Sequence, residues 1–393
     1  MNYNNRYEND STAAMRTVCA VAFIIFSFCF LYFRQADVLC LAQHVLSGGQ
    51  TVYSPVWGAV LITFALFLLH RGVNSYFRIN RRFHWLTYLP PMLLLTIITD
   101  ISPDIDKRFS FGSWLWVAPL VLIVWTVSVY ALKSIQNYEA DINSRGVLSR
   151  LTWVNLFALG IMFMATGFIS AGNDVFHYRA KVETLMVDGR YDEATMVGIK
   201  SMRTDTSLTM LRCYALARES RMADEMFHYP VACNSSALLP LGNSSRMVLY
   251  PVDSLYSFLG ARPRPGMGTS HYLRALLASG YHNKAISDYI LCGMLVDRNI
   301  DAFVHELPKH YAINDSLPVH YREALIMYTH MRSRPVLIYK NQVMDTDFDD
   351  FKSFEDSITD PKARMLAVHE QYFGTYWWYY DYGNKVIGYR KNY

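Results

Sequence analysis

The sequence predicts an all-α protein in two parts, a bundle of about five membrane-spanning helices followed by a domain of paired helices. Two observations predict this fold class. Long apolar runs dominate residues 17–172, and a helix needs about 20 mainly apolar residues to cross a bilayer. Residues 173–393 are charged throughout and contain a recurring helix–turn–helix pattern. We therefore expect a transmembrane domain over 1–172 and a second helical domain over 173–393.

The overall composition conceals this division. The 393 residues are 52% hydrophobic and 18% charged, values that would suit one ordinary soluble protein and describe neither part. The net charge of +4 is weak and the basic residues are scattered, so we expect no nucleic-acid partner. The six cysteines form no CxxC pair, which argues against a zinc ribbon or a thioredoxin-type site. A disulfide among Cys213, Cys233 and Cys292 stays open.

Five apolar stretches are expected to cross the membrane, at residues 17–33, 53–69, 85–99, 114–132 and 151–171. The third contains Pro90–Pro91 and must kink or begin irregularly there. The first is interpreted as a retained span, because bulky residues at 31–33 replace the small residues of a signal-peptide cleavage site. Residues 36–47 have helical apolar spacing and are expected to lie along the membrane surface.

The polar and aromatic residues of the spans favour a packed bundle. No Asp, Glu, Lys or Arg lies in the middle of a span, which disfavours a transporter. Asn155 lies near a helix end, where a hydrogen bond between helices is expected. The tryptophans near span ends indicate an interfacial aromatic belt; they are Trp57, Trp85, Trp114, Trp116 and Trp153.

The basic residues predict the orientation, because Lys and Arg of short loops are retained in the cytoplasm. Nine lie on the side of the amino terminus and three on the other side. The nine are Arg6, Arg16, Arg71, Arg78, Arg81, Arg82, Lys133, Arg145 and Arg150, and the three are Arg34, Lys107 and Arg108. With five spans, the amino terminus is cytoplasmic and residues 173–393 are periplasmic in a Gram-negative cell.

A turn pattern recurs in the second part. GRYDEA at 189–194 and GYHNKA at 280–285 each separate two amphipathic helical patterns. Glycine permits the tight turn and alanine a close approach of the helices. A degenerate copy has Ser220 and Glu225 at these two positions. The pattern resembles the tetratricopeptide repeat (TPR), which implies a TPR-like α-solenoid. The expected packing residues of the turns are Gly189, Tyr191, Ala194, Gly280 and Ala285.

An aromatic segment lies near the carboxy terminus, where eight of the eleven residues at 372–382 are aromatic. Three interpretations stay open. The segment packs between the last helices, docks on the membrane interface, or forms a surface that binds a protein partner or a glycan. The residues of such an interaction surface would be Tyr376, Trp377, Trp378, Tyr379 and Tyr380.

Three polar clusters have the residue types of known sites without their full patterns. Residues 305–310 read HExxxH and include a proline, whereas a zinc helix needs HExxH. Residues 345–356 match the spacing of a calcium loop but lack its glycine and final glutamate. Asp104 and Asp106 are paired carboxylates in a loop predicted to be extracytoplasmic, where they would bind a divalent metal or act as a base. We expect no resident metal or cofactor.

Several segments in both parts carry a resemblance to known proteins: residues 42–53, 81–82, 99–101, 317–328 and 375–380. On these, the chain resembles an uncharacterised family of bacterial inner-membrane proteins. The resemblance implies a membrane bundle joined to a repeat-like helical domain, and it implies no activity or functional residue.

The function that we expect is a non-enzymatic scaffold. The bundle would anchor the chain in the bilayer, and the helical domain would bind a protein or peptide partner outside the cytoplasm. The alternative is an enzyme of envelope glycans or lipid-linked sugars that uses Asp104 and Asp106.

Overall fold

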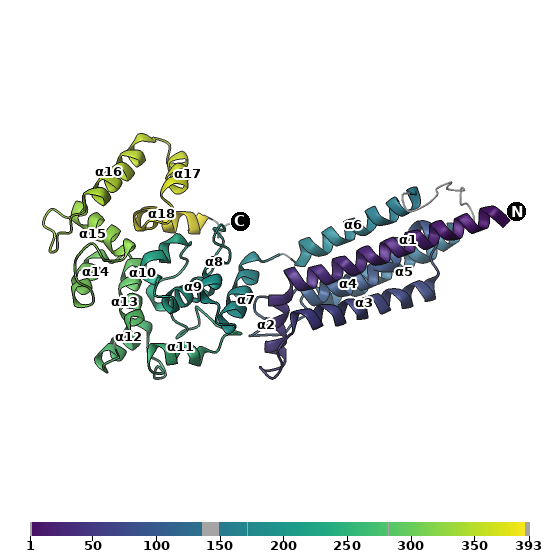
Figure 1. Cartoon of the computed structure of the whole chain (residues 1–393), viewed down its shortest axis with the longest axis horizontal. Helices are drawn as coiled ribbons and strands as arrows, with labels where there is room; N and C mark the ends of the chain where they lie inside the picture. Colours follow the sequence, from purple (N-terminus) through teal and green to yellow (C-terminus); the bar gives the residue numbers. More distant parts are fainter. Residues whose placement is uncertain (1, 136–148, 171, 282, 390–393) are drawn as a thin grey trace. The chain divides into compact units, whose positions relative to one another are not determined.

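The computed structural model describes residues 2–135, 149–170, 172–281 and 283–389, and their regular secondary structure is helical (Figure 1). The all-α prediction is confirmed for these residues. The chain divides into two units, Met1–His177 (unit 1) and Tyr178–Tyr393 (unit 2). Arg145 of the charge count and His282 of the second turn block lie outside the described residues.

Unit 1 is a bundle of long apolar helices. Its elements are α1 (Asn2–Cys29), the π-helical η1 (Phe30–Arg34), α2 (Ala36–Leu46), α3 (Pro55–Phe77), the 3₁₀ segment η2 (Arg81–Tyr88), α4 (Leu89–Thr99), α5 (Trp114–Ile135) and α6 (Arg150–Ser170). Four helices are long and apolar enough to cross a membrane: Thr12–Arg34, Pro55–Phe77, Trp114–Lys133 and Arg150–Ser170. These helices support membrane association.

The predicted third span at 85–99 is not a continuous α-helix, so the count of five is corrected to four helices of membrane length. Its first part belongs to η2, and only Leu89–Thr99 is α-helical. Phe83 leaves the helical region of the backbone, with φ −111° and ψ 25°. The physical reason is Pro90–Pro91, because prolines lack the N–H groups that would bond the preceding turn of an α-helix.

Side chains of α5 and α6 satisfy the backbone of η2. The Asn155 amide accepts a hydrogen bond from Trp85 N (2.8 Å) and donates one to Arg81 O (3.0 Å). In an α-helix these two backbone groups would bond to each other, so the amide replaces the missing bond. Trp125 Nε1 donates to Leu86 O at 2.9 Å. The predicted helix–helix bond at Asn155 is thus confirmed, and it serves irregular backbone that lipid would not tolerate.

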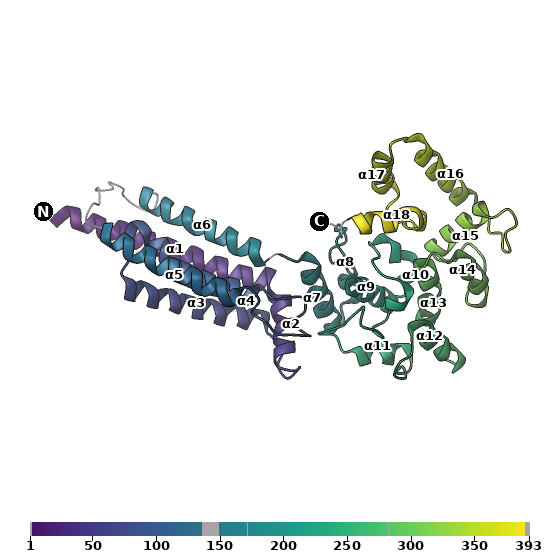
Figure 2. The ribbon, with the colours of Figure 1, turned by 180° about the vertical axis from the view of Figure 1, so that it is seen from behind.

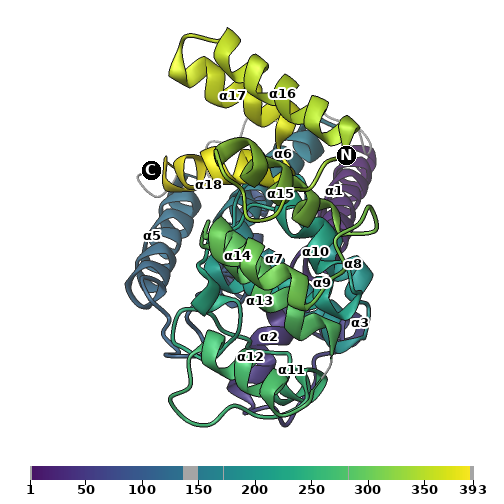
Figure 3. The same ribbon diagram turned by 90° about the vertical axis from the view of Figure 1, so that its left-hand side faces the viewer.

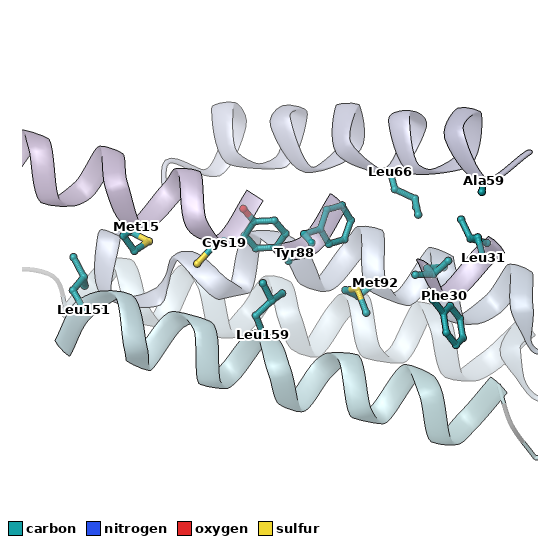
Figure 4. Packing of buried hydrophobic residues seen from close by; sticks show 12 residues of the cluster. Met15, Cys19, Phe30, Leu31, Ala59, Leu66, Tyr88, Met92, Leu151 and Leu159 are labelled. Carbon is teal, nitrogen blue, oxygen red and sulfur yellow. The ribbon is translucent and has the colours of Figure 1, made fainter. Parts of the chain in front are cut away.

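The core of unit 1 lies among α1, α3, α4 and α6 (Figure 4). Hydroxyl pairs also join α4 to α6: Thr96 Oγ1 lies 3.0 Å from Thr166 Oγ1, and Thr99 Oγ1 lies 2.7 Å from Ser170 Oγ. The two helices therefore run side by side and end together. The buried core residues are Met15, Cys19, Phe23, Phe30, Leu31, Ala59, Leu66, Tyr88, Met92, Leu95, Leu151 and Leu159.

Unit 2, which begins within α7, is a series of shorter packed helices (Figure 2). They are α7 (Asp174–Val187), α8 (Tyr191–Met196), α9 (Thr206–Arg218), α10 (Met222–Glu225), α11 (Val252–Leu259), α12 (Thr269–Ala278), α13 (Lys284–Val296), α14 (Ile300–Glu306), α15 (Val319–Met331), α16 (Gln342–Ser357), α17 (Pro361–Tyr372) and α18 (Tyr376–Tyr389). Three 3₁₀ turns intervene, η4 (Met226–His228), η5 (Ser235–Ala237) and η6 (Leu307–Lys309).

Four helix pairs of unit 2 share one turn geometry. The turn residues Gly189, Ser220, Gly280 and Arg298 have left-handed φ values of 74°, 57°, 84° and 57°. In each turn, the N–H of the next residue donates to the carbonyl five positions before it. This is the 6→1 bond of the Schellman motif. The degenerate copy at Ser220 therefore forms the same turn as the glycine copies. Arg298 forms a fourth turn of this kind, which the sequence did not predict because arginine does not favour a left-handed backbone.

We expect Ser220→Gly to stabilise unit 2 by about 0.5–1 kcal/mol, because a left-handed backbone strains residues that carry a Cβ. Gly280→Ala should destabilise it by about 1 kcal/mol for the same reason. Guanidinium unfolding of the full chain in detergent measures both. Ser279→Gly is the matched control, since Ser279 has an ordinary φ of −87°, and a stabilising effect there would contradict the explanation.

Candidate functional site

The predicted turn residues of unit 2 differ in their surroundings: the alanines are buried and the glycines have open space around them. Ala194 and Ala285 are buried, with exposed fractions of 0% and 5%. Tyr191 is half-buried, and its hydroxyl lies 2.9 Å from the Tyr250 hydroxyl. No atom lies within 4 Å of the position that a Cβ would take on Gly189 or Gly280, so these glycines serve the turn conformation rather than a close contact.

The aromatic segment is part of the core of unit 2. Tyr376, Trp377, Trp378 and Tyr379 are at most 3% exposed, and Tyr380 is half-buried. They belong to α18, which packs against α15 and α17 (Figure 3). The interpretation of these residues as an exposed interaction surface is therefore wrong. Their large apolar rings are used in packing between the last helices, the first of the three alternatives.

A buried carboxylate fixes α18 to α15. Glu323 is 5% exposed, and its Oε2 accepts a hydrogen bond from Tyr376 N at 2.7 Å. The same oxygen lies 2.9 Å from His320 Nδ1, and His320 Nε2 accepts from Phe227 N at 3.4 Å. The Glu323 carbonyl also accepts from Trp377 Nε1 at 2.8 Å. A side chain of α15 thus caps the first turn of α18.

A second buried carboxylate, Asp288 on α13, accepts hydrogen bonds from two phenols. Tyr311 Oη lies 2.5 Å and Tyr321 Oη 2.9 Å from Asp288 Oδ1. Asp288 is 2% exposed. Burial raises the pKa of this carboxyl above its ordinary value of 3.8, although the two hydroxyl donors oppose the rise.

Stability should therefore fall as the pH rises from 3.8 toward the raised pKa of Asp288. Over that window the unfolded chain has lost the proton that the folded chain keeps. Asp288→Asn keeps an oxygen acceptor for both phenols and should flatten this part of the stability profile. Unfolding free energies from roughly pH 4 to pH 8 measure the effect. Asp301→Asn, at an exposed ion pair with Arg332, should leave the profile unchanged; an equal flattening there would contradict the assignment.

The predicted paired carboxylates of unit 1 lie in an exposed turn between α4 and α5. The Asp104 carboxylate is 62% exposed and lies 3.4 Å from Lys107 Nζ. Asp106 is also exposed. The arrangement gives neither group the burial that adjusts a catalytic acid or base. Within the described residues, no group of three or more His, Cys, Asp or Glu side chains is placed to hold a metal ion.

A cavity of about 520 Å³ lies beside this turn, between α2, the first half of α3, the end of α4 and the α4–α5 connection. We call it the α2–α4 groove. Its walls are mainly aliphatic and aromatic, and its polar lining includes Asp100, Arg108 and Tyr53. Asp100 Oδ2 accepts a hydrogen bond from Trp114 Nε1 at 2.7 Å. Sequence reasoning selected two residues of the neighbouring turn and missed the groove, because its lining comes from distant segments.

A polar cluster inside the unit 1 bundle was also missed. His70, His84 and Tyr88 are at most 3% exposed. His70 Nε2 lies 3.0 Å from Thr87 Oγ1, and the His70 ring stacks on Tyr88 with centroids 3.9 Å apart. The prediction that no Asp, Glu, Lys or Arg lies in the middle of a span did not consider histidine, and α3 holds the buried His70 next to Arg71. The signal in the sequence was a histidine directly after the apolar run at 53–69.

The remaining polar motifs form local pairs. In the HExxxH segment, Glu306 Oε2 accepts from Lys309 Nζ at 2.8 Å, and Glu306 Oε1 lies 3.4 Å from His310 Nε2. In the acidic segment, Asp345 Oδ1 lies 3.2 Å from His330 Nε2. The three cysteines considered for a disulfide, Cys213, Cys233 and Cys292, are free thiols.

Comparison with known proteins connects part of unit 2 to a family model. The model of a family of unknown function (DUF6057) matches residues 267–383. This region includes the Gly280 and Arg298 turns, Glu323 and the aromatic segment. No curated protein and no solved structure matches the chain. The match agrees with a resemblance to an uncharacterised family and carries no activity.

Proposed function

We propose that this protein is a membrane-anchored interaction scaffold of a bacterial inner membrane. Unit 1 anchors it, with the amino terminus in the cytoplasm, and unit 2 is a TPR-like domain that binds a protein or peptide on the extracytoplasmic side. The observation that carries the proposal is the path of η2 and α4 through the bundle, which supports a further crossing and therefore an odd number of crossings.

The segment formed by η2 and α4 is long enough to cross. At about 2.0 Å per residue for a 3₁₀ helix and 1.5 Å for an α-helix, each part rises about 16 Å. Their sum is close to the thickness of about 30 Å of a bilayer core. The segment also runs parallel to α6, from Trp85 beside Asn155 to Thr99 beside Ser170. If α6 crosses the membrane, its parallel neighbour crosses as well, as a broken fifth crossing.

The basic residues support the proposed orientation. Arg81 lies beside the start of α6 through its bond to Asn155. Lys133 Nζ, near the end of α5, lies 6.0 Å from the Phe77 ring at the end of α3. Arg81 and Lys133, two of the nine basic residues on the side of the amino terminus, thus lie at the same end of the bundle. The positive-inside rule assigns this end to the cytoplasm.

Two features of unit 2 support a binding domain. Helix pairs joined by the same Schellman turn recur along unit 2, and TPR-like arrays are built from recurring helix pairs. In addition, the end of α15, the start of α16 and the residues that join them, together called the apolar connection, expose four apolar side chains: Met331 (44%), Val336 (70%), Ile338 (60%) and Val343 (69%). Neighbouring exposed apolar side chains are a common mark of interaction sites. This apolar connection lies within the matched family region.

Reporter fusions test the orientation. Alkaline phosphatase, which is active only outside the cytoplasm, should be active when fused after Gly172 or after the carboxy terminus. A fluorescent protein that folds only in the cytoplasm should be bright at the amino terminus. Cytoplasmic location of both downstream fusions would overturn the odd number of crossings.

Photo-crosslinking tests the binding role. A photoreactive amino acid at Val336 or Ile338 should give a protein adduct of one discrete mass in intact cells. The same residue at Lys362, an exposed polar position on α17, is the control and should give none. Lipid adducts alone at Val336, or identical products at all three positions, would contradict the scaffold.

A further inference from the structure

We propose that the α2–α4 groove binds one phospholipid with an amine headgroup. The lipid phosphate would lie at Arg108 and the ammonium group at Asp100. An acyl chain would follow Ile62, Ile97 and Ile98. This proposal concerns unit 1 alone and does not depend on the partner or the orientation of unit 2.

The size and lining of the groove fit an amphiphilic ligand. Its volume of about 520 Å³ lies within the range of roughly 300–1,000 Å³ that is usual for small-molecule sites. Most of the lining is apolar, with a few polar groups among aliphatic and aromatic side chains. Phe109 and Phe111 remain more than half exposed, at 53% and 55%. The groove is therefore open enough for a chain to enter and apolar enough to retain it.

The position of the groove in the bundle points to a lipid rather than a soluble ligand. Ile62 comes from α3, a helix of membrane length, and Ile97 and Ile98 come from the last turn of α4. Trp114 lines the same groove where α5 begins. Tryptophan at the end of a spanning helix marks the headgroup level. The groove thus extends from the headgroup level toward the hydrocarbon, as a bound phospholipid does.

The charges select the headgroup. Arg108 is an exposed cation and Asp100 an exposed anion in the lining. Guanidinium groups bind phosphate by charge-assisted hydrogen bonds, and a carboxylate can accept a bond from an ammonium group. The connection at 100–108 has three aspartates against two basic residues. This excess of negative charge opposes an anionic headgroup and favours one that also carries a positive charge.

Tyr53 supplies a further polar contact. Its hydroxyl is buried in the groove wall and has no hydrogen-bond partner among the described residues. Burial raises the pKa of Tyr53, so the phenol stays protonated and can donate. A Cβ on Gly58 would overlap the Tyr53 ring, so this glycine permits the ring position. An ester carbonyl of the lipid is an acceptor that would satisfy this hydroxyl.

Native mass spectrometry of the full chain, released from mild detergent, tests the proposal. Synthetic phosphatidylethanolamine should give a complex with one bound lipid, and phosphatidylglycerol of the same chain length should bind less. Arg108→Ala should lower the occupancy by phosphatidylethanolamine about tenfold, the effect of losing one charge-assisted bond. Lys107→Ala removes the neighbouring charge, which pairs with Asp104, and should change occupancy less than twofold.

A second pair of variants tests the groove itself. Ile101→Trp places a large ring in the groove wall and should abolish the single bound lipid. Val52→Trp adds the same ring at an 87% exposed position outside the lining and should not. Thermal unfolding of each variant confirms that it is folded. Equal losses in Arg108→Ala and Lys107→Ala, binding that survives Ile101→Trp, or tighter binding of phosphatidylglycerol would each overturn the proposal.

Discussion

Replacing Asn155 with alanine is expected to destabilise unit 1 by about 2 kcal/mol, a large effect for one polar side chain in a membrane bundle. The amide is bonded to both Trp85 N and Arg81 O. Its loss leaves two partly buried backbone groups of η2 without a hydrogen-bond partner, and each costs more than an unpaired group at the surface. Unfolding in mixed SDS micelles, followed by tryptophan fluorescence, measures the loss.

Two controls separate this role from general packing. Thr126→Ala removes a hydroxyl that bonds only within its own helix, to Leu122 O at 2.7 Å, and should be nearly neutral. Asn155→Leu keeps the volume but not the bonds, so it should be as harmful as the alanine variant. If leucine restores the stability, volume rather than the bridged backbone explains the site.

The sequence predicted most of the helices but not the form of the segment at 85–99. Apolar length located four of the helices, since a run of that length has few other folded states. Pro90–Pro91 indicated an irregular start. The extent of η2 depended on Asn155 and Trp125, residues distant in the sequence that satisfy its backbone. Only the packed bundle brings these donors and acceptors together.

The features of the candidate sites also differ in this respect. Some follow from the local sequence, and others depend on contacts between residues that are distant in the sequence. The left-handed turns at Gly189 and Gly280 were predictable because glycine favours that conformation locally. The buried state of Trp377 and Trp378 was not, since a run of aromatic residues suits a core and an interface equally well. The α2–α4 groove was also not predictable, because four separate segments form its wall.

Glu323→Ala is expected to have the largest effect in unit 2, a loss of about 3 kcal/mol at the junction of α15 and α18. The variant leaves Tyr376 N and His320 Nδ1 without their shared acceptor, and both lie among fully buried residues. Because the Tyr376 N–H belongs to the first turn of α18, the helix should loosen from its amino-terminal end. Hydrogen exchange of the full chain should accelerate most in residues 376–383.

The matched comparisons distinguish a specific anchor from the loss of any carboxylate. Glu323→Gln retains an oxygen that can accept from Tyr376 N, so most of the protection of α18 should return. Glu193→Ala breaks an exposed pair with Arg190, and such pairs contribute at most about 1 kcal/mol. If Glu323→Ala leaves the exchange of α18 unchanged while lowering stability elsewhere, the carboxylate is not what holds this helix. If glutamine fails as alanine does, the charge rather than the cap is required, because glutamine keeps the acceptor and removes only the negative charge.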